Sequence, residues 1–441
     1  MIRKVNLILL VLMTLAGFGL TSFLFYPYHV NWDAGNVIDN ILQGHPVYDN
    51  WMGWFYPALV GGLVKLTNLP HAIGLLQWIL YWTAVPTLFV QLFSVRKRFF
   101  PLFYLAFAFF PGALFYVDYI SNSALLYCLY LVMCSISVWM IRRATWWKLV
   151  MEIFLAIICV CLRADAMFVV LPTLVLVLYR CYGRLWRMAG IVAIGFLALK
   201  TIESVVVAQV PGYNDRINSI QLIALYDQMH ISRLKQELVI PDSILADGVS
   251  RSQMLDSIMT YKEMENDYTF YASNEDLLRS GNNWRSGVTP APVIYLENLQ
   301  YYLRHRLRIL RKYWLGAPEL YNAIGDFEYK SPSYLGWVYH YFGWILYFGM
   351  PAIGYLFFGL IAMVATLSLR SLRRAVVTLL YIWTMWLGIL MLSVTSVSSR
   401  YIYPACLCMY QMMIYMLYCR WKDWSDSRHN ITLPQTLDRE L

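Results

Sequence analysis

Long, uninterrupted apolar runs constrain the fold of this 441-residue chain more than any other feature of its sequence. The first extends from about Val5 to Tyr26, and similar runs recur along the chain. Hydrophobic residues make up 59% of the chain and charged residues 14%, against about 45–50% and about 25% in soluble domains. Such runs favour spanning helices, because a membrane β-barrel needs alternating segments of about 10 residues. The sequence therefore predicts an all-α polytopic membrane protein.

Ten membrane spans account for these runs. We predict them at 5–26, 71–94, 99–117, 123–141, 149–162, 166–179, 188–209, 342–367, 375–394 and 402–419. A single interrupted helix over 149–179, or a hairpin over 334–369, would move a basic cluster to the other side. With ten spans, one side receives the basic clusters at 3–4, 96–98, 142–143, 180–187, 370–374 and 420–422. The positive-inside rule makes that side the cytoplasm. Both termini are then cytoplasmic, and this topology explains the net charge of +9 without a nucleic-acid partner.

The topology divides the chain into four parts. These are an N-terminal membrane module (1–210) with a first outer loop (27–70), a mainly helical extracytoplasmic region (211–333), C-terminal spans (334–419) and a polar, disordered cytoplasmic tail (420–441). The eight cysteines lie in or beside apolar segments and none lies in 211–333. That distribution indicates neither a disulfide scaffold nor a Cys/His metal site.

The first outer loop carries an amphipathic pattern. From Asn31 the sequence reads NWDAGNVIDNILQG, with apolar residues at 34, 37, 38, 41 and 42 on one helical stripe. Gly44 is suited to end the helix. We expect an interfacial helix over about 33–43 with its apolar side on the membrane. Asp33 near its start is either a solvated N-cap or a functional carboxylate.

The next residues, HPVYDNWMGWFYP, complete a recognisable order of motifs, with His45, Tyr48 and Asp49 crowded before a further apolar run. An acidic residue, an amphipathic helix, Gly-x-Pro-x-Tyr-Asp and Tyr-Pro resemble the first luminal loop of the GT-C glycosyltransferase superfamily. That superfamily includes bacterial protein O-mannosyltransferases and the lipid A aminoarabinose transferase, polytopic enzymes that use polyprenyl-phosphate sugars. The resemblance covers about 1–200 and 390–420, and the stretch 211–333 has no counterpart.

The resemblance implies a site on the outer face of a bacterial cytoplasmic membrane. Asp33 would be the catalytic base, although Ala34 stands where many relatives have a second acidic residue. Asp118 or Asn122, in DYISNSALLYCL, would occupy the place of a further acidic residue. Arg163, in CLRADA, and Arg400, in SSRYIYP, match arginine-containing segments of relatives. The outer loops lack a DxD pair, so we expect no metal and no cofactor.

Several charged residues allow two interpretations each. The spans around Arg163 and Asp165 are about 14 residues, or roughly 21 Å, against a hydrocarbon core of about 30 Å. Their connecting turn should lie below the surface, where Arg163 either contacts the donor phosphate, with Asp165 as a candidate for substrate binding, or pairs with Asp165 to close the turn. Lys200 and Glu203 form an i, i+3 pair or contribute to substrate binding. Arg400 is a headgroup anchor or a second phosphate ligand.

The segment YYLRHRLRILRKYW (301–314) predicts a basic amphipathic helix. Leu303, Leu307, Leu310 and Trp314 share one stripe, with Arg304, Arg308 and Arg311 beside it. A helix of this kind suits anionic membrane lipids, which we expect the three arginines to contact.

The function expected from the resemblance is inverting transfer of a sugar from a polyprenyl-phosphate donor to an extracytoplasmic glycan, glycolipid or protein. Two alternatives stay open. One is a polysaccharide polymerase that uses polyprenyl-pyrophosphate glycans. The other is a transporter or flippase for a lipid-linked sugar, a class that often shows internal repeats, which this sequence lacks.

Overall fold

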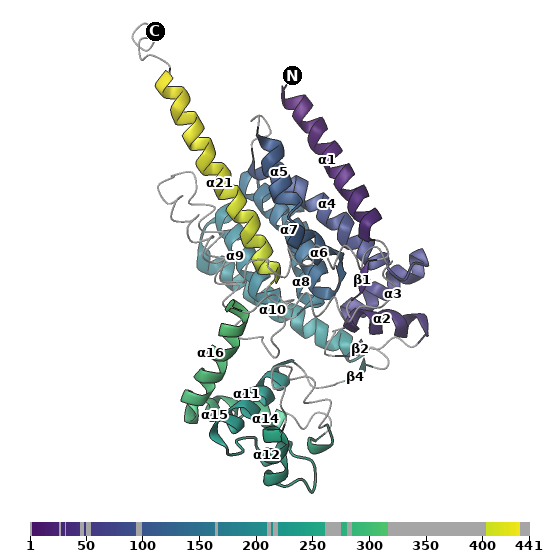
Figure 1. Ribbon diagram of the computed structural model, residues 1–441, viewed down its shortest axis with the longest axis vertical. Helices are drawn as coiled ribbons and strands as arrows, with labels where there is room; N and C mark the ends of the chain where they lie inside the picture. Colours follow the sequence, from purple (N-terminus) through teal and green to yellow (C-terminus); the bar gives the residue numbers. More distant parts are fainter. Residues whose placement is uncertain are drawn as a thin grey trace.

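The computed structural model describes residues 2–25, 28–30, 32–44, 48–49, 54–93, 99–163, 166–209, 213–214, 219–260, 275–279, 285–315 and 403–432. Its first unit is a helical bundle (Figure 1). The helices of that unit are α1 (Ile2–Phe25), α2 (Trp32–Leu42), α3 (Phe55–Thr67), α4 (Ala72–Leu92), α5 (Phe100–Ala108), α6 (Pro111–Asp118), α7 (Asn122–Arg142), α8 (Trp146–Leu162), α9 (Met167–Tyr182), α10 (Leu185–Val207) and α21 (Tyr403–Thr432). Four two-residue strands accompany the helices: β1 (His29–Val30), β2 (Tyr48–Asp49), β3 (Tyr119–Ile120) and β4 (Tyr213–Asn214).

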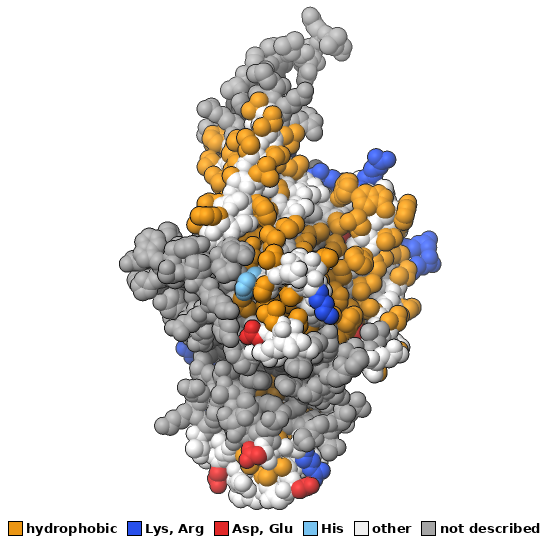
Figure 2. Space-filling view, turned by 90° about the vertical axis from the view of Figure 1, so that its right-hand side faces the viewer, with side chains coloured by type: hydrophobic (Ala, Val, Ile, Leu, Met, Phe, Trp, Pro, Cys, Tyr) orange, Lys and Arg blue, Asp and Glu red, His pale blue; other side chains and the backbone are white. Residues whose placement is uncertain are grey.

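Four helices are long and apolar enough to cross a membrane. They cover Val5–Phe25, Ala72–Leu92, Asn122–Arg142 and Leu185–Val205, within α1, α4, α7 and α10. Figure 2 shows apolar side chains covering much of the upper part of one face. The chain is therefore a mostly helical membrane protein, as its composition predicted. The expected spans at 342–367 and 375–394 lie outside the described residues.

The span predicted over 99–117 corresponds to two helices, α5 and α6, with a break between them. α5 ends at Ala108 and α6 begins at Pro111, and the two helices are bent by 41°. Proline cannot donate a backbone hydrogen bond and disfavours helical backbone in the residue before it. Phe110 is accordingly extended, with φ −61° and ψ 119°. As one bent span, α5 and α6 would be a fifth membrane crossing.

The stretch 149–179 forms two helices, as we preferred from the sequence. α8 ends at Leu162 and α9 begins at Met167, and the C-cap residue Arg163 is extended (φ −152°). The two helices have 17 and 16 residues, so each is shorter than the four spans above. The break at Arg163 therefore lies between two short apolar helices.

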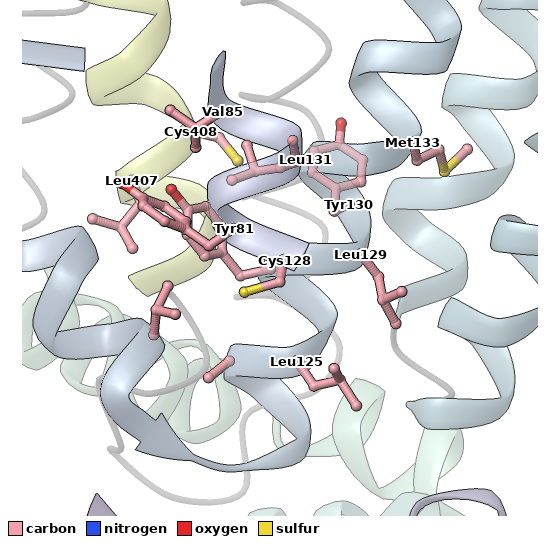
Figure 3. Packing of buried hydrophobic residues seen from close by; sticks show 14 of the residues in the cluster. Tyr81, Val85, Leu125, Cys128, Leu129, Tyr130, Leu131, Met133, Leu407 and Cys408 are labelled. Carbon is pink, nitrogen blue, oxygen red and sulfur yellow. The ribbon is translucent and has the colours of Figure 1, made fainter. Parts of the chain in front are cut away.

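Helices α4, α7 and α21 share one buried core (Figure 3). Tyr81 of α4, Cys128 of α7 and Cys408 of α21 all lie in it, with Tyr81 and Cys128 fully inaccessible. The hydroxyl of Tyr81 donates a hydrogen bond to the carbonyl of Ala108 at 2.6 Å, which satisfies the end of α5. This packing brings the last described helix of the chain against its N-terminal module.

The prediction of a disordered tail from residue 420 is wrong as far as residue 432, because α21 continues to Thr432. Trp421 packs against Phe99 and Phe103, with ring centroids 5.6 and 5.7 Å apart. These aromatic contacts stabilise the start of the extension. Residues 433–441 lie outside the described part of the chain.

The amphipathic helix of the first outer loop is present as α2, but its apolar side is not on the membrane. Ala34, Val37 and Ile38 are buried in the protein core. Helix α3, which the sequence analysis did not predict, packs against α2 and supplies part of this cover. The interfacial prediction is therefore wrong for these three residues, because a protein surface already buries them.

A second, smaller unit lies at the opposite end of the molecule from the start of α1 (Figure 1). It contains α11 (Ser219–Lys235), η2 (Asp242–Ile244), α12 (Arg251–Thr260), η3 (Glu275–Leu277), α14 (Arg285–Val288), α15 (Ala291–Glu297) and α16 (Leu299–Leu315). It has a hydrophobic core of its own, which includes Leu225, Met254 and Ile258. The described part of 211–333 is thus mainly helical, as predicted.

A buried polar cluster joins α11 to α16 in this second unit. Asp227 of α11 accepts a hydrogen bond from the guanidinium of Arg306 at 2.5 Å, and its other oxygen lies 3.2 Å from Nε2 of His305. The Asp227 and His305 side chains are 2% and 3% exposed. The ring of His230 stacks on His305 at 4.0 Å. Burial, together with the neighbouring His230 ring and the Arg306 guanidinium, lowers the pKa of His305 to about 4 in spite of the Asp227 carboxylate.

Candidate active site

Two parallel strands bring the first outer loop to the turn between α6 and α7. In β1 and β3, His29 pairs with Tyr119 and Val30 with Ile120. Each strand is followed almost at once by a helix: α2 begins at Trp32 and α7 at Asn122. Segments about 90 positions apart in the sequence therefore deliver two helix N-termini side by side, with Asp33 in the first turn of α2. The side chain of Asp33 lies outside the described part of the structure.

The N-terminus of α7 is held by a conventional cap. Ser121 is extended (φ −159°, ψ 158°), and its hydroxyl accepts a hydrogen bond from the backbone N–H of Ala124 at 3.1 Å. Ser123 donates a hydrogen bond to Asn122 Oδ1 at 3.3 Å. Helix N-termini carry a partial positive charge and favour anionic groups. The convergence of α2 and α7 therefore gives this end of the bundle a positive electrostatic bias.

Arg163 adds a full positive charge to this place. The residue caps the C-terminus of α8, and its guanidinium donates a hydrogen bond to the hydroxyl of Ser123 in the first turn of α7. Arg163 is half-buried, so part of its side chain stays accessible. The turn predicted to line a cavity is thus tied to the start of α7. Asp165 lies outside the described residues, and its expected pairing with Arg163 stays a prediction.

Asp118 ends α6 directly before β3 and is completely buried. Gln77 of α4, also completely buried, holds the backbone on both sides of it: Gln77 Nε2 donates to the carbonyl of Val117 at 2.8 Å and to that of Tyr119 at 3.3 Å. The sequence analysis missed Gln77. Its signal was an amide side chain within a largely apolar span, where a polar side chain needs a partner.

Gly74 of α4 lets the strand pair approach the helix. A Cβ at this position would lie 2.5 Å from the ring of Tyr28 and 3.1 Å from Ile120. Tyr28, directly before β1, has a left-handed backbone (φ 75°), which is uncommon for a bulky residue. The backbone around β1 is therefore constrained both by its own conformation and by close contact with α4.

The second strand pair connects the same loop with the second unit. In β2 and β4, Tyr48 pairs with Tyr213 and Asp49 with Asn214, in parallel. The side chains of these four residues lie outside the described part of the structure. The predicted site residues His45 and Arg400 lie outside it completely. The structure therefore gives the backbone position of Tyr48 and Asp49, which lie beside β4, the strand that precedes the second unit.

Lys200 and Glu203 form the ion pair that their spacing allowed. Lys200 Nζ lies 2.5 Å from Glu203 Oε2 within α10, with side chains 33% and 18% exposed. This pairing supports the structural interpretation of the two residues.

The three arginines singled out in α16 are exposed, and so are Leu303 and Leu307 beside them. The helix buries His305 and Arg306 instead. In Figure 1, α16 rises from the second unit toward the membrane helices, and Ile309 packs against the core of the first unit. The C-terminal end of α16, with Arg308 and Arg311, is therefore the end that approaches the membrane helices.

Taken together, the β1–β3 pairing and the Arg163–Ser123 hydrogen bond bring one guanidinium and two helix N-termini to one end of the bundle, with Asp118 buried directly before β3. Such a site can bind a phosphate group, and a carboxylate in the first turn of α2 can act as a base beside it. In comparisons with known proteins, no family model, no curated protein and no solved structure matches the chain.

Proposed function

We propose that the chain is an inverting membrane glycosyltransferase of the GT-C type. It takes a sugar from a polyprenyl-phosphate donor and transfers it to an extracytoplasmic glycan, glycolipid or protein. The observation that carries this proposal is the parallel pairing of β1 with β3. It sets the helix that carries Asp33 beside the helix turn that Arg163 contacts.

The proposed topology has ten spans, with both termini in the cytoplasm and the site on the outer face of a bacterial cytoplasmic membrane. Three features support it. The N-terminal end of α1 and the C-terminal end of α21 lie at one end of the bundle, and the second unit lies at the other (Figure 1). The pairing of β2 with β4 joins the first outer loop to that second unit. Arg142 and Arg143, at the end of α7, suit a cytoplasmic surface.

In the proposed reaction, the Asp33 carboxylate accepts the proton of the acceptor hydroxyl as general base. The acceptor oxygen forms a bond to the anomeric carbon of the donor sugar. The bond between that carbon and the phosphate oxygen breaks, and its electron pair leaves with the polyprenyl phosphate. Arg163 stabilises the negative charge that develops on this phosphate. Arg400 is proposed as a second phosphate ligand, and attack from the opposite face inverts the anomeric centre.

A donor assay on the purified, full-length protein tests the reaction. Incubation with a polyprenyl-phosphate sugar and an acceptor should release polyprenyl phosphate. Release of polyprenyl pyrophosphate from a pyrophosphate-linked glycan would identify a polymerase instead. Movement of an intact lipid-linked sugar across the membrane, without cleavage, would identify a transporter.

A matched pair of variants in α2 tests the role of Asp33. Asp33→Asn should insert normally and lose transfer, because an amide cannot accept the proton. Asp39→Asn removes another carboxylate of the same helix and should retain transfer. Normal turnover by the Asp33→Asn protein would rule out this residue as the base.

A further inference from the structure

A carboxyl group that has no ion pair among the described residues lies inside the helical bundle, away from the site described above. Glu152 of α8 is completely buried. Its Oε1 accepts a hydrogen bond from the hydroxyl of Ser137 in α7. Among the described residues, its Oε2 has no hydrogen-bond partner. The residue lies less than two turns into α8 from Trp146, so it belongs to the end of the bundle that carries Arg142.

The nearest lysine does not compensate this carboxyl. Lys148 lies one turn earlier in α8 and is also buried, but its ammonium group donates to the carbonyls of Arg143 at 2.7 Å and Trp139 at 3.5 Å. It also lies over the ring of Trp139, 4.2 Å from the ring centroid. The cation is therefore satisfied by backbone oxygens and an aromatic face at the end of α7, and no ion pair joins it to Glu152 in the described structure.

Three thiols of the described residues also surround the carboxyl. Cys134 of α7, Cys159 of α8 and Cys181 of α9 lie within electrostatic reach of Glu152. A lone carboxylate in such surroundings is costly, because neither water nor a cation stabilises its charge. One carboxyl and one hydroxyl also supply too few oxygens for a hard metal ion such as Ca²⁺, which takes about six to eight. A proton needs only one.

We propose that Glu152 is a proton-binding site between α7 and α8, occupied at neutral pH. Oε1 is then the carbonyl oxygen that accepts from Ser137, and Oε2 carries the proton. Loss of that proton leaves a negative charge between two packed helices, which can be stabilised only when the helices separate and admit water. The contact between α7 and α8 is therefore linked to the proton. This proposal is independent of glycosyl transfer.

Infrared spectroscopy of the full-length protein in lipid nanodiscs tests the site directly, because a neutral carboxylic acid has a carbonyl absorption that an ionised one lacks. At neutral pH the wild type should show this band, and Glu152→Gln should lose it. Glu203→Gln is the control, since it removes a carboxylate paired with Lys200, and should leave the band unchanged. An identical band in the wild type and Glu152→Gln would overturn the proposal.

Two further measurements test exchange of the proton and the hydrogen bond to Oε1, and neither depends on the Glu152→Gln variant. Transfer of the folded wild type to D₂O should shift the band to lower frequency, and an unshifted band would contradict an exchangeable site. Ser137→Ala keeps the acid but removes the hydrogen bond to Oε1, so the band should move to higher frequency. An unmoved band in that variant would assign the absorption to another acid and overturn the proposal.

Discussion

The guanidinium of Arg163 donates a hydrogen bond to the hydroxyl of Ser123, which joins the end of α8 to the first turn of α7. The hydrogen bond fixes a cation beside a capped helix N-terminus, where both favour an anionic ligand. It also explains why the chain can end α8 at a charged residue between two short apolar helices.

The first prediction concerns this contact. Arg163→Gln removes the charge and should lower kcat/KM for the donor by about 10²–10³-fold, the range seen when one donor to a developing anion is lost. Ser123→Ala keeps the charge but removes the hydroxyl that holds the Arg163 guanidinium. It should lower kcat/KM by about tenfold, which corresponds to about 1.4 kcal/mol of activation free energy. Steady-state kinetics with a polyprenyl-phosphate sugar measure both. Equal losses in the two variants would contradict a direct role for the arginine.

The second prediction concerns the close approach of β1 and β3 to α4. Gly74→Ala must displace the ring of Tyr28 and press on Ile120, which should cost about 1–3 kcal/mol of stability. Gly62→Ala is the matched control, because nothing lies within 4 Å of a Cβ at that position of α3. The control should stabilise the protein by about 0.5–1 kcal/mol. Thermal unfolding in detergent measures the stability of both variants. An unchanged stability in Gly74→Ala would mean that the strand pair of β1 and β3 can move away from α4.

The third prediction concerns the buried carboxylate of the second unit. Asp227→Asn leaves Arg306 buried without its counter-charge and should destabilise this unit by about 3–5 kcal/mol. Asp242→Asn breaks an exposed pair with Arg251 and should cost about 0–1 kcal/mol. Hydrogen exchange of the α11 and α16 amides distinguishes the two variants. Similar protection in both would show that Asp227 contributes no more than a surface charge.

The fourth prediction is a pH dependence from His305. Its pKa is about 4 in the folded protein and about 6.5 when unfolded, so the unfolded state binds more protons between these values. The contribution of His305 to stability is therefore complete above about pH 6.5 and is lost as the pH falls toward 4, by up to about 3 kcal/mol. The groups around it are Asp227, His230 and Arg306.

Hydrogen exchange of α16 at several pH values, corrected for intrinsic exchange rates, measures this effect. His305→Gln cannot be protonated and should lose most of the pH dependence in that window. The same pH dependence in the variant would assign it to another group.

The fifth prediction concerns the exposed arginines of α16. Replacing Arg304, Arg308 and Arg311 by Gln should raise the apparent KM for a lipid-linked substrate in anionic bilayers and leave kcat largely unchanged. Because α16 rises toward the membrane helices, the single change Arg311→Gln should have a larger effect than Arg304→Gln. An unchanged KM in the triple variant would leave this helix without a role at the lipid surface.

Local patterns in the sequence were sufficient for the long helices. The apolar runs predicted α1, α4, α7 and α10 closely, because the length and hydrophobicity of a span are properties of one segment. The same holds for α2, whose periodicity predicted a helix. Even the break before Pro111 was accessible from the sequence, since proline restricts the residue that precedes it.

Only the tertiary structure decided what each helix face meets. The apolar side of α2 is buried by α3 and the core rather than by lipid, and α16 buries His305 and Arg306 while Leu303 and Leu307 stay exposed. An amphipathic pattern predicts that a helix has an apolar face and a polar face. It does not predict what buries the apolar face, because the covering surface belongs to another segment. The site follows the same rule. The residue types around Arg163 and Asp33 could be read from the sequence, whereas the register of β1 on β3 depends on contacts between segments about 90 positions apart, which no local periodicity contains.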